Sequence, residues 1–207
     1  MTHIRHSEKV FIMKRLLLVL ILAFSFQSLS KADDISDFMI EGISLGDSAL
    51  DFFSEEKLLE RKKVGFIYPK EDFYSATIYR DPKFKLYNNI QLHIKKNDNN
   101  YIIHSIGGQI EFPNDINSCY EELENIISQF KNDFTYTDFY DSGVVSHADK
   151  VSGTVRSVYI TLKKKDEIVI ECYDYNKKTQ EKKGHIDKLN LALDSSEFSQ
   201  WLNNVYE

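Results

Sequence analysis

The sequence contains few of the residues that interrupt regular structure. Its 207 residues include only eight glycines and three prolines, Pro69, Pro82 and Pro113. This scarcity argues against a loop-rich or low-complexity scaffold. The two cysteines are far apart, so a Cys-x-x-Cys metal spacing is absent. No apolar run approaches the roughly 20 residues that a membrane-spanning helix needs.

Positive charge is also scarce. The chain has 26 basic and 32 acidic residues, for a net charge of −6. Residues 1–32 contain five of the basic residues and one of the acidic residues, so residues 33–207 carry a net charge of −10. Phosphate backbones and anionic lipids repel such a protein, which excludes nucleic acid as a partner. With 42% hydrophobic and 13% aromatic residues, the chain is too apolar to be disordered.

The N-terminal part has the pattern of an export signal. Lys14 and Arg15 precede the apolar run Leu16–Phe26, and Ser30 and Ala32 place small residues at positions −3 and −1 of a cleavage site. Because the run is short and polar residues end it, we expect cleavage after Ala32; an uncleaved membrane anchor is the alternative.

This interpretation divides the chain into three parts. Residues 1–12 are an upstream extension or a misassigned start, residues 13–32 are the signal peptide, and residues 33–207 form one mature domain. No cysteine lies near the cleavage site, so lipid attachment is not expected, and no stable membrane anchor remains after cleavage. We expect a periplasmic or secreted protein.

Two segments of the mature chain resemble each other. Ile90–Asp98 matches Val158–Asp166 at an offset of 68 positions, and apolar residues alternate with polar ones in both. Such alternation is typical of a half-buried strand. A second strand is expected after each, over Tyr101–Phe112 and Glu167–Tyr175, and Ile186–Leu193 is expected to close the sheet.

A helix is expected before each hairpin, over Ser48–Lys62 and Asn117–Asp133, where apolar residues recur at helical spacing. The simplest account is two copies of a helix-plus-strands unit, residues 41–112 and 113–193; convergence of similar strands is the alternative. A closing helix is expected at 195–206. The expected fold class is α+β, an antiparallel sheet with helices packed on one face.

Two motifs resemble sites of serine hydrolases. Gly42-Ile-Ser-Leu-Gly46 matches the G-x-S-x-G pattern, but the βαβ context that this elbow requires is missing. Gly46-Asp-Ser48 resembles the first block of GDSL-type hydrolases, whose other blocks are absent. The alternative is that Asp47 or Ser48 caps the following helix. No catalytic residue is assigned; an exported hydrolase using Ser44, Ser48 or Cys119 remains the alternative.

The two cysteines are candidates for a disulfide. Cys119 belongs to the apolar stripe of its helix, and Cys172 belongs to the apolar face of its strand. Both are expected to point to the same helix–sheet interface, in an oxidising compartment. Two separate buried thiols, or a catalytic thiol at Cys119 activated by the helix N-terminus, are the alternatives.

The histidines show no metal-ligand spacing, and neither a metal nor a cofactor is expected. His104 alternates with isoleucines on its strand and is expected in the core. His93 lies opposite the apolar residues of its strand and is expected in solvent, on the other side of the hairpin.

Two surface features are conspicuous. Lysines concentrate in the second hairpin and the loop after it, which suits solvated turns. These lysines are Lys163–Lys165, Lys177, Lys178, Lys182 and Lys183. Aromatic and acidic residues alternate over 133–141, which suits sugars or cationic ligands but is also typical of a loop pinned to the core.

With these residues in view, the chain resembles a family of small exported proteins of unknown function from marine alphaproteobacteria. The resemblance implies a compartment and a domain extent but no activity. It rests on Glu41–Ser48 with Asp51–Lys57, the hairpin Asn89–Phe112, Asn117–Glu122, and Lys183–Asp187 with Glu197–Leu202. In topology, a doubled helix-plus-strands unit also resembles β-lactamase-inhibitor-protein-like tandem domains and the outer-membrane-assembly lipoproteins, although a lipidation cysteine is missing.

These features together predict an exported, soluble, non-catalytic module that binds a protein or a small ligand of the cell envelope.

Overall fold

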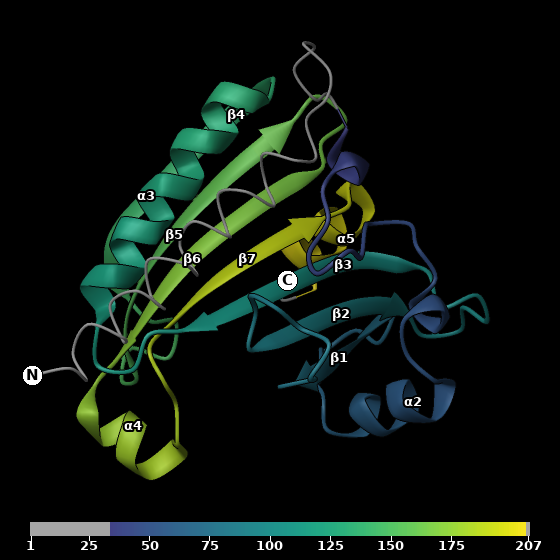
Figure 1. The fold of residues 1–207 in the computed structure, drawn as a ribbon, viewed down its shortest axis with the longest axis horizontal. Helices are drawn as coiled ribbons and strands as arrows, with labels where there is room; N and C mark the ends of the chain where they lie inside the picture. Colours follow the sequence, from purple (N-terminus) through teal and green to yellow (C-terminus); the bar gives the residue numbers. More distant parts are fainter. Residues whose placement is uncertain (1–33, 206–207) are drawn as a thin grey trace, which may run out of the picture. The chain divides into compact units, whose positions relative to one another are not determined.

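The computed structural model describes residues 34–205. The expected signal peptide at 13–32 and the extension at 1–12 lie outside the described residues. The described chain is built on a seven-stranded antiparallel sheet in the order β1-β2-β3-β7-β6-β5-β4 (Figure 1). The α+β class is therefore as expected from the sequence.

The sheet consists of two three-stranded meanders joined by the last strand. β7 lies between β3 and β6, so it hydrogen-bonds to one meander on each side. The strands are β1 (Phe73–Tyr79), β2 (Asn89–Lys95), β3 (Ile103–Glu111), β4 (Tyr136–Ser146), β5 (Gly153–Leu162), β6 (Glu167–Tyr175) and β7 (Lys188–Asp194). Each meander follows a helix, which is the arrangement that the two similar segments predict.

Two strands were not expected from the sequence. β1 has polar side chains on one face, but α5 and the loop before β1 cover that face. Every residue of β1 except the last is therefore buried. β4 occupies the aromatic and acidic stretch that suggested a loop. β4 is an edge strand, and the register shifts that follow Tyr136 and Asp141 interrupt its pairing with β5. Bulges and charges of this kind protect an exposed edge from pairing with another chain.

The helices match the sequence expectations in part. They are η1 (Ile35–Asp37), η2 (Ala49–Asp51), α2 (Glu55–Lys63), α3 (Ile116–Asp133), α4 (Lys177–Lys183) and α5 (Ser196–Asn204). The prediction of a single helix over Ser48–Lys62 is wrong, because the segment forms two helices. Ser48 is the N-cap of the short η2, and Ser54 is the N-cap of α2, where its side chain accepts a hydrogen bond from Lys57 N. No helix within residues 34–205 is long and apolar enough to cross a membrane.

One face of the sheet, the apolar face, is buried. Its side chains come from every strand of the centre and are almost fully inaccessible: Ile90, Leu92, Ile106, Leu191, Leu193, Ile168, Ile170, Val158 and Ile160. α3 packs against β6 and β7 on this face (Figure 1). Phe38 of the N-terminal segment packs on Phe130 and Phe134, with ring centroids 4.8 and 4.3 Å apart. Burial of these apolar side chains is the main stabilising contribution to the fold.

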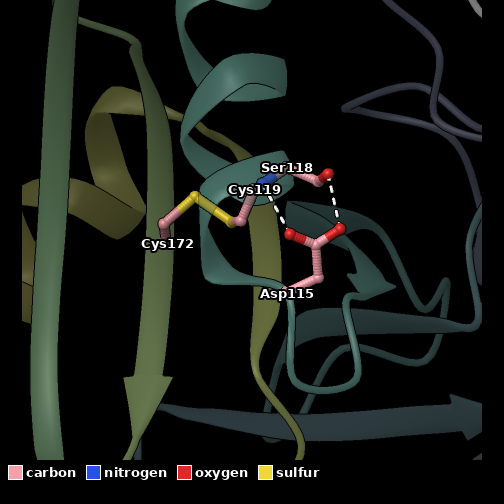
Figure 2. Close-up of a disulfide and its surroundings, with 4 residues drawn as sticks. All are labelled: Asp115, Ser118, Cys119 and Cys172. Carbon is pink, nitrogen blue, oxygen red and sulfur yellow. Dashed lines mark hydrogen bonds between the residues drawn. A yellow bond between two sulfur atoms is a disulfide. The ribbon is translucent and has the colours of Figure 1, made fainter.

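A disulfide fastens α3 to the sheet. Cys119 in the first turn of α3 is bonded to Cys172 of β6, with Cα atoms 6.0 Å apart (Figure 2). Asp115 caps this helix: its carboxylate accepts hydrogen bonds from Ser118 N at 3.2 Å and Ser118 Oγ at 2.6 Å. The cap fixes where the helix begins and so directs Cys119 at the sheet. The disulfide expected from the sequence is confirmed.

The opposite face of the sheet, here called the polar face, carries mostly hydrophilic side chains that are buried or half-buried. It is defined by Thr77, Asn89, Gln91, Gln109, Glu111, Lys188, Asn190, Glu171, Ser157 and Tyr173, which alternate with the apolar-face residues along their strands. Its far end is covered by α5, whose Phe198 stacks on His93 with centroids 4.5 Å apart. The expectation of helices on one face therefore holds for α3, whereas α5 packs against the other.

Candidate functional site

A row of polar side chains crosses the polar face. The strand register places Asn89, Gln109, Asn190, Glu171 and Ser157 side by side on five neighbouring strands. Ser157 Oγ donates to Glu171 Oε1 at 2.9 Å, and Asn190 Nδ2 donates to Glu171 Oε2 at 3.3 Å. Asn89 Nδ2 donates to Gln109 Oε1 at 3.4 Å. These bonds orient amide and carboxylate groups across the width of the sheet.

A groove of about 660 Å³ lies over part of this row. Its floor consists of Thr77, Asn89, Gln91, Gln109, Glu111 and Lys188. One wall is the segment 64–66 after α2, and the other is Tyr175 with the segment 184–186 after α4. This volume is within the range of roughly 300–1,000 Å³ that small-molecule sites occupy, and the convergent polar groups suit orientation of a ligand.

The wall at 64–66 is held tightly against the sheet. Phe66 N donates to Ser75 Oγ at 2.7 Å, and a Cβ atom on Gly65 would lie 2.2 Å from the backbone oxygen of Ser75. Only glycine permits this approach. The same segment exposes Val64 (66%) and Phe66 (57%), so this rim of the groove is apolar although its floor is polar.

The floor contains a polar group that folding alone does not require. Asn89 is only 8% exposed, and its Oδ1 atom has no hydrogen-bond partner among the described residues. Leaving a buried acceptor unsatisfied costs about 1–3 kcal/mol. An apolar residue in this strand would avoid that cost, so the Asn89 amide is a costly polar group in the lining of the groove.

Lys188 brings an ammonium group into the same floor. Its Nζ lies 5.4 Å from the centroid of the Tyr173 ring, and no carboxylate of residues 34–205 lies within ion-pair distance of it. Burial lowers the pKa of Lys188, while the charges of Glu171 and Glu111 oppose that shift. The carboxylate of Glu111 is instead held by Arg80, at 2.7 and 3.0 Å.

Aromatic rings extend the polar face beyond the groove. Tyr173 and Tyr175 stack with centroids 5.9 Å apart and an interplanar angle of 11°, and His147 contacts both. His185 packs edge-on against Tyr175 at 4.7 Å. Burial raises the pKa of Tyr175 to about 12, so its hydroxyl group keeps its proton at neutral pH.

The candidate nucleophiles from the sequence are engaged elsewhere. Ser44 Oγ donates to Phe38 O at 3.0 Å, and Ser48 Oγ donates to Asn100 O at 2.6 Å. Cys119 is in the disulfide and carries no thiol. Within residues 34–205 no histidine is within hydrogen-bond distance of any of the three, so the geometry of an activated nucleophile is absent from these positions.

The surroundings expected for two histidines are wrong. His93 was expected in solvent but is 7% exposed, because α5 covers its end of the polar face. His104 was expected in the core but lies at the surface of the sheet, where its Nδ1 is 3.4 Å from Glu197 of α5. A bulge between His93 and Ile94 shifts the register of the hairpin. Both histidines therefore face α5 instead of opposite sides.

The buried histidine belongs to a hydrogen-bonded chain that sequence inspection missed. Tyr68 OH is 2.8 Å from His93 Nε2, His93 Nδ1 is 3.0 Å from Ser105 Oγ, and Ser105 pairs with Asp194 across β3 and β7. In a hydrolase triad the histidine stands between serine and carboxylate. Here the carboxylate lies beside the serine, and Ser105 is only 2% exposed, so this chain is a structural element of the α5 interface.

Burial determines the protonation of Asp194 and His93, two titratable groups of this hydrogen-bonded network. It raises the pKa of Asp194 to about 7, an effect that the Ser105 hydroxyl group opposes. It lowers the pKa of His93 to about 3, so the imidazole is neutral at physiological pH.

Within the part of the chain that the structure describes, no three histidine, cysteine or acidic side chains are grouped as a metal site. The groove residues come from separate strands and were not singled out in the sequence, although the polar positions of each alternating segment are the signal that could have found them. Comparison with protein-family models, with curated proteins and with solved structures finds no match to this chain.

Proposed function

We propose that this chain is an exported binding protein of the cell envelope that takes a small polar ligand in the groove of its polar face, without catalysing a reaction on it. The observation that carries the proposal is the groove itself. It has the volume of a ligand site, a floor of amide, hydroxyl, carboxylate and ammonium groups, and a partly apolar rim. In this floor Asn89 Oδ1 has no hydrogen-bond partner, and the Lys188 ammonium group has no ion-pair partner, among the described residues.

Export is the second part of the proposal. The sequence pattern around Ala32 supports it, and the disulfide between Cys119 and Cys172 is consistent with an oxidising compartment. Mass spectrometry of the chain recovered from the envelope fraction should give a protein that begins at Asp33 with its two thiols joined. Recovery of the intact chain with reduced cysteines from the cytosol would contradict this part.

The binding proposal is tested with a small-molecule extract of the envelope. The protein is mixed with the extract, freed of unbound compounds by ultrafiltration, and analysed by mass spectrometry. We expect one compound or a related set to be retained by the unmodified protein and by Lys165→Gln, which changes a remote hairpin turn. The same compounds should be lost from Gln109→Trp, which fills the floor.

Two results would count against binding in the groove. One is the absence of any retained compound. The other is equal retention by Gln109→Trp and by a second groove-filling variant, Gln91→Trp, once circular dichroism has shown that both are folded.

A further inference from the structure

Positive charge gathers at one end of the groove although the protein as a whole is acidic. α4 carries four exposed lysines against one acidic residue: Lys177, Lys178, Lys182 and Lys183, with Glu181. The wall segment 184–186 follows this helix directly. The charges of Lys183 and Lys188 act on the wall residue His185 and add to the effect of burial in lowering its pKa. The groove therefore has a cationic end, next to α4.

The carboxylates near this end are already engaged. Glu171 accepts hydrogen bonds from Ser157, Asn190 and Tyr173, the last at 2.7 Å. Glu111 is paired with Arg80. Both carboxylates act on Lys188 from a distance, but neither approaches it within ion-pair distance, so this half-buried ammonium group has no direct carboxylate partner among residues 34–205.

A cation held away from water without a partner is costly, and charge-assisted hydrogen bonds are the usual compensation. A neutral ligand would displace water from Lys188 without supplying a charge. A cationic ligand would add to the positive charge of α4. An anionic group gives the ammonium group a direct partner, and the Tyr175 hydroxyl group in the adjoining wall offers a further proton donor.

We propose that the ligand carries an oxyanion, a carboxylate or a phosphate, which binds Lys188 at the α4 end of the groove while the amides of Asn89, Gln91 and Gln109 contact an uncharged polar body. This inference rests on the proposed function of the groove and adds the chemical class of its ligand. The α4 lysines attract the anion over a longer range, and Lys188 is its direct partner.

The test uses four probes that share a pyranose body. Glucuronate and glucose 6-phosphate supply the two oxyanions, glucose is uncharged, and glucosamine is cationic. Each is titrated at constant ionic strength into ¹⁵N-labelled protein, purified from the cell fraction in which it accumulates, and amide shifts are followed by NMR. We expect saturable shifts at Gly184, His185 and Lys188 with one or both anionic probes, and weaker binding of glucose and glucosamine.

The matched variants are Lys188→Met, which removes the ammonium group but keeps most of the unbranched side chain, and Lys165→Gln, which removes a remote charge. Lys188→Met should weaken binding of the anionic probe about ten- to hundredfold, whereas Lys165→Gln should leave it unchanged. The preferred anionic probe shows whether the site suits a carboxylate or a phosphate.

Two results would overturn the inference in different ways. If glucose binds the groove as tightly as the anionic probes, and Lys188→Met has no effect, the oxyanion site is wrong while the groove remains a binding site. If no probe shifts any groove amide, both the inference and the proposed function are contradicted.

Discussion

Replacing Asp194 with asparagine should remove a pH dependence of folding that burial creates. Asp194 is 6% exposed at the end of β7, and its pKa rises from 3.8 to about 7 in the folded protein. Between these two values the unfolded chain is ionised while the folded chain keeps its proton. The unfolded state therefore binds fewer protons, and the stability of the wild type falls as the pH rises through this range.

The magnitude follows from the size of the shift. Each pKa unit corresponds to about 1.4 kcal/mol, so Asp194 costs about 2 kcal/mol of stability between pH 5 and pH 7, where the folded carboxyl group begins to ionise. An asparagine side chain at this position would have nearly the same shape and no charge. The difference in free energy of unfolding, Asp194→Asn minus wild type, should therefore increase by about this amount across the interval and level off above pH 7.

His93 changes the stability in the opposite direction as the pH rises, so the wild type alone cannot show the contribution of Asp194. Its pKa is lowered to about 3, so below its unfolded pKa near 6.5 the unfolded chain takes up a proton that the folded chain does not. This contribution stabilises the fold above pH 6.5 and is lost as the pH falls. In the wild type the two trends partly cancel between pH 5 and pH 6.5, whereas the comparison with Asp194→Asn isolates the carboxyl group.

The assay is urea unfolding of both proteins at pH 5, 6, 7 and 8, with the disulfide intact. Linear extrapolation gives the free energy of unfolding at each pH. Parallel stability curves for the two proteins would refute the reasoning, because they would show that Asp194 titrates alike in the folded and unfolded states.

Three further substitutions test other parts of the structure. Replacing Cys119 and Cys172 together with alanine should lower the free energy of unfolding by about 2–4 kcal/mol, measured by urea denaturation, because the bridge joins residues 53 positions apart. Gly65→Ala should lower the melting temperature and alter the groove, because its Cβ would lie 2.2 Å from a backbone oxygen of β1. Gly107→Ala should have little effect, because the nearest atom to its Cβ would be 3.4 Å away. Equal effects of the two substitutions would contradict the assigned contact. Glu41→Gln should weaken the hydrogen bonds that the Glu41 carboxylate accepts from three backbone amides before β2. Hydrogen exchange should then be faster at those amides, and unchanged rates would show that the carboxylate does not stabilise this segment.

The elements that the sequence predicted best are those whose periodicity matches their final burial. β6 has the predicted bounds, and α3 differs from its predicted range by one residue, because each has one apolar side facing one core. The pairing of Cys119 with Cys172 was predictable because each cysteine lies on the apolar side of its helix or strand. Local pattern was sufficient wherever a single buried face determines the structure.

The predictions that failed concern elements without a periodic apolar pattern, or positions that depend on contacts between distant segments. α4 has no apolar stripe; it is defined by its caps, where Asn176 accepts a hydrogen bond from Thr179 N and Gly184 adopts a left-handed conformation. The environment of His93 depends on a bulge and on α5, more than 100 residues later in the chain. The groove combines residues of β1, β2, β3, β6 and β7 with two loops, and only the strand order brings these together.

The position of β7 also bears on when the protein can fold. The two meanders can form early, but β7, the strand that joins them, follows both of them in the sequence. Until that C-terminal segment emerges, from the ribosome or from a translocation channel, each half leaves an unpaired strand edge and an unsealed core. Completion of the sheet is thereby delayed until β7 has emerged, and a chain that stops before β7 should fail to assemble the native sheet.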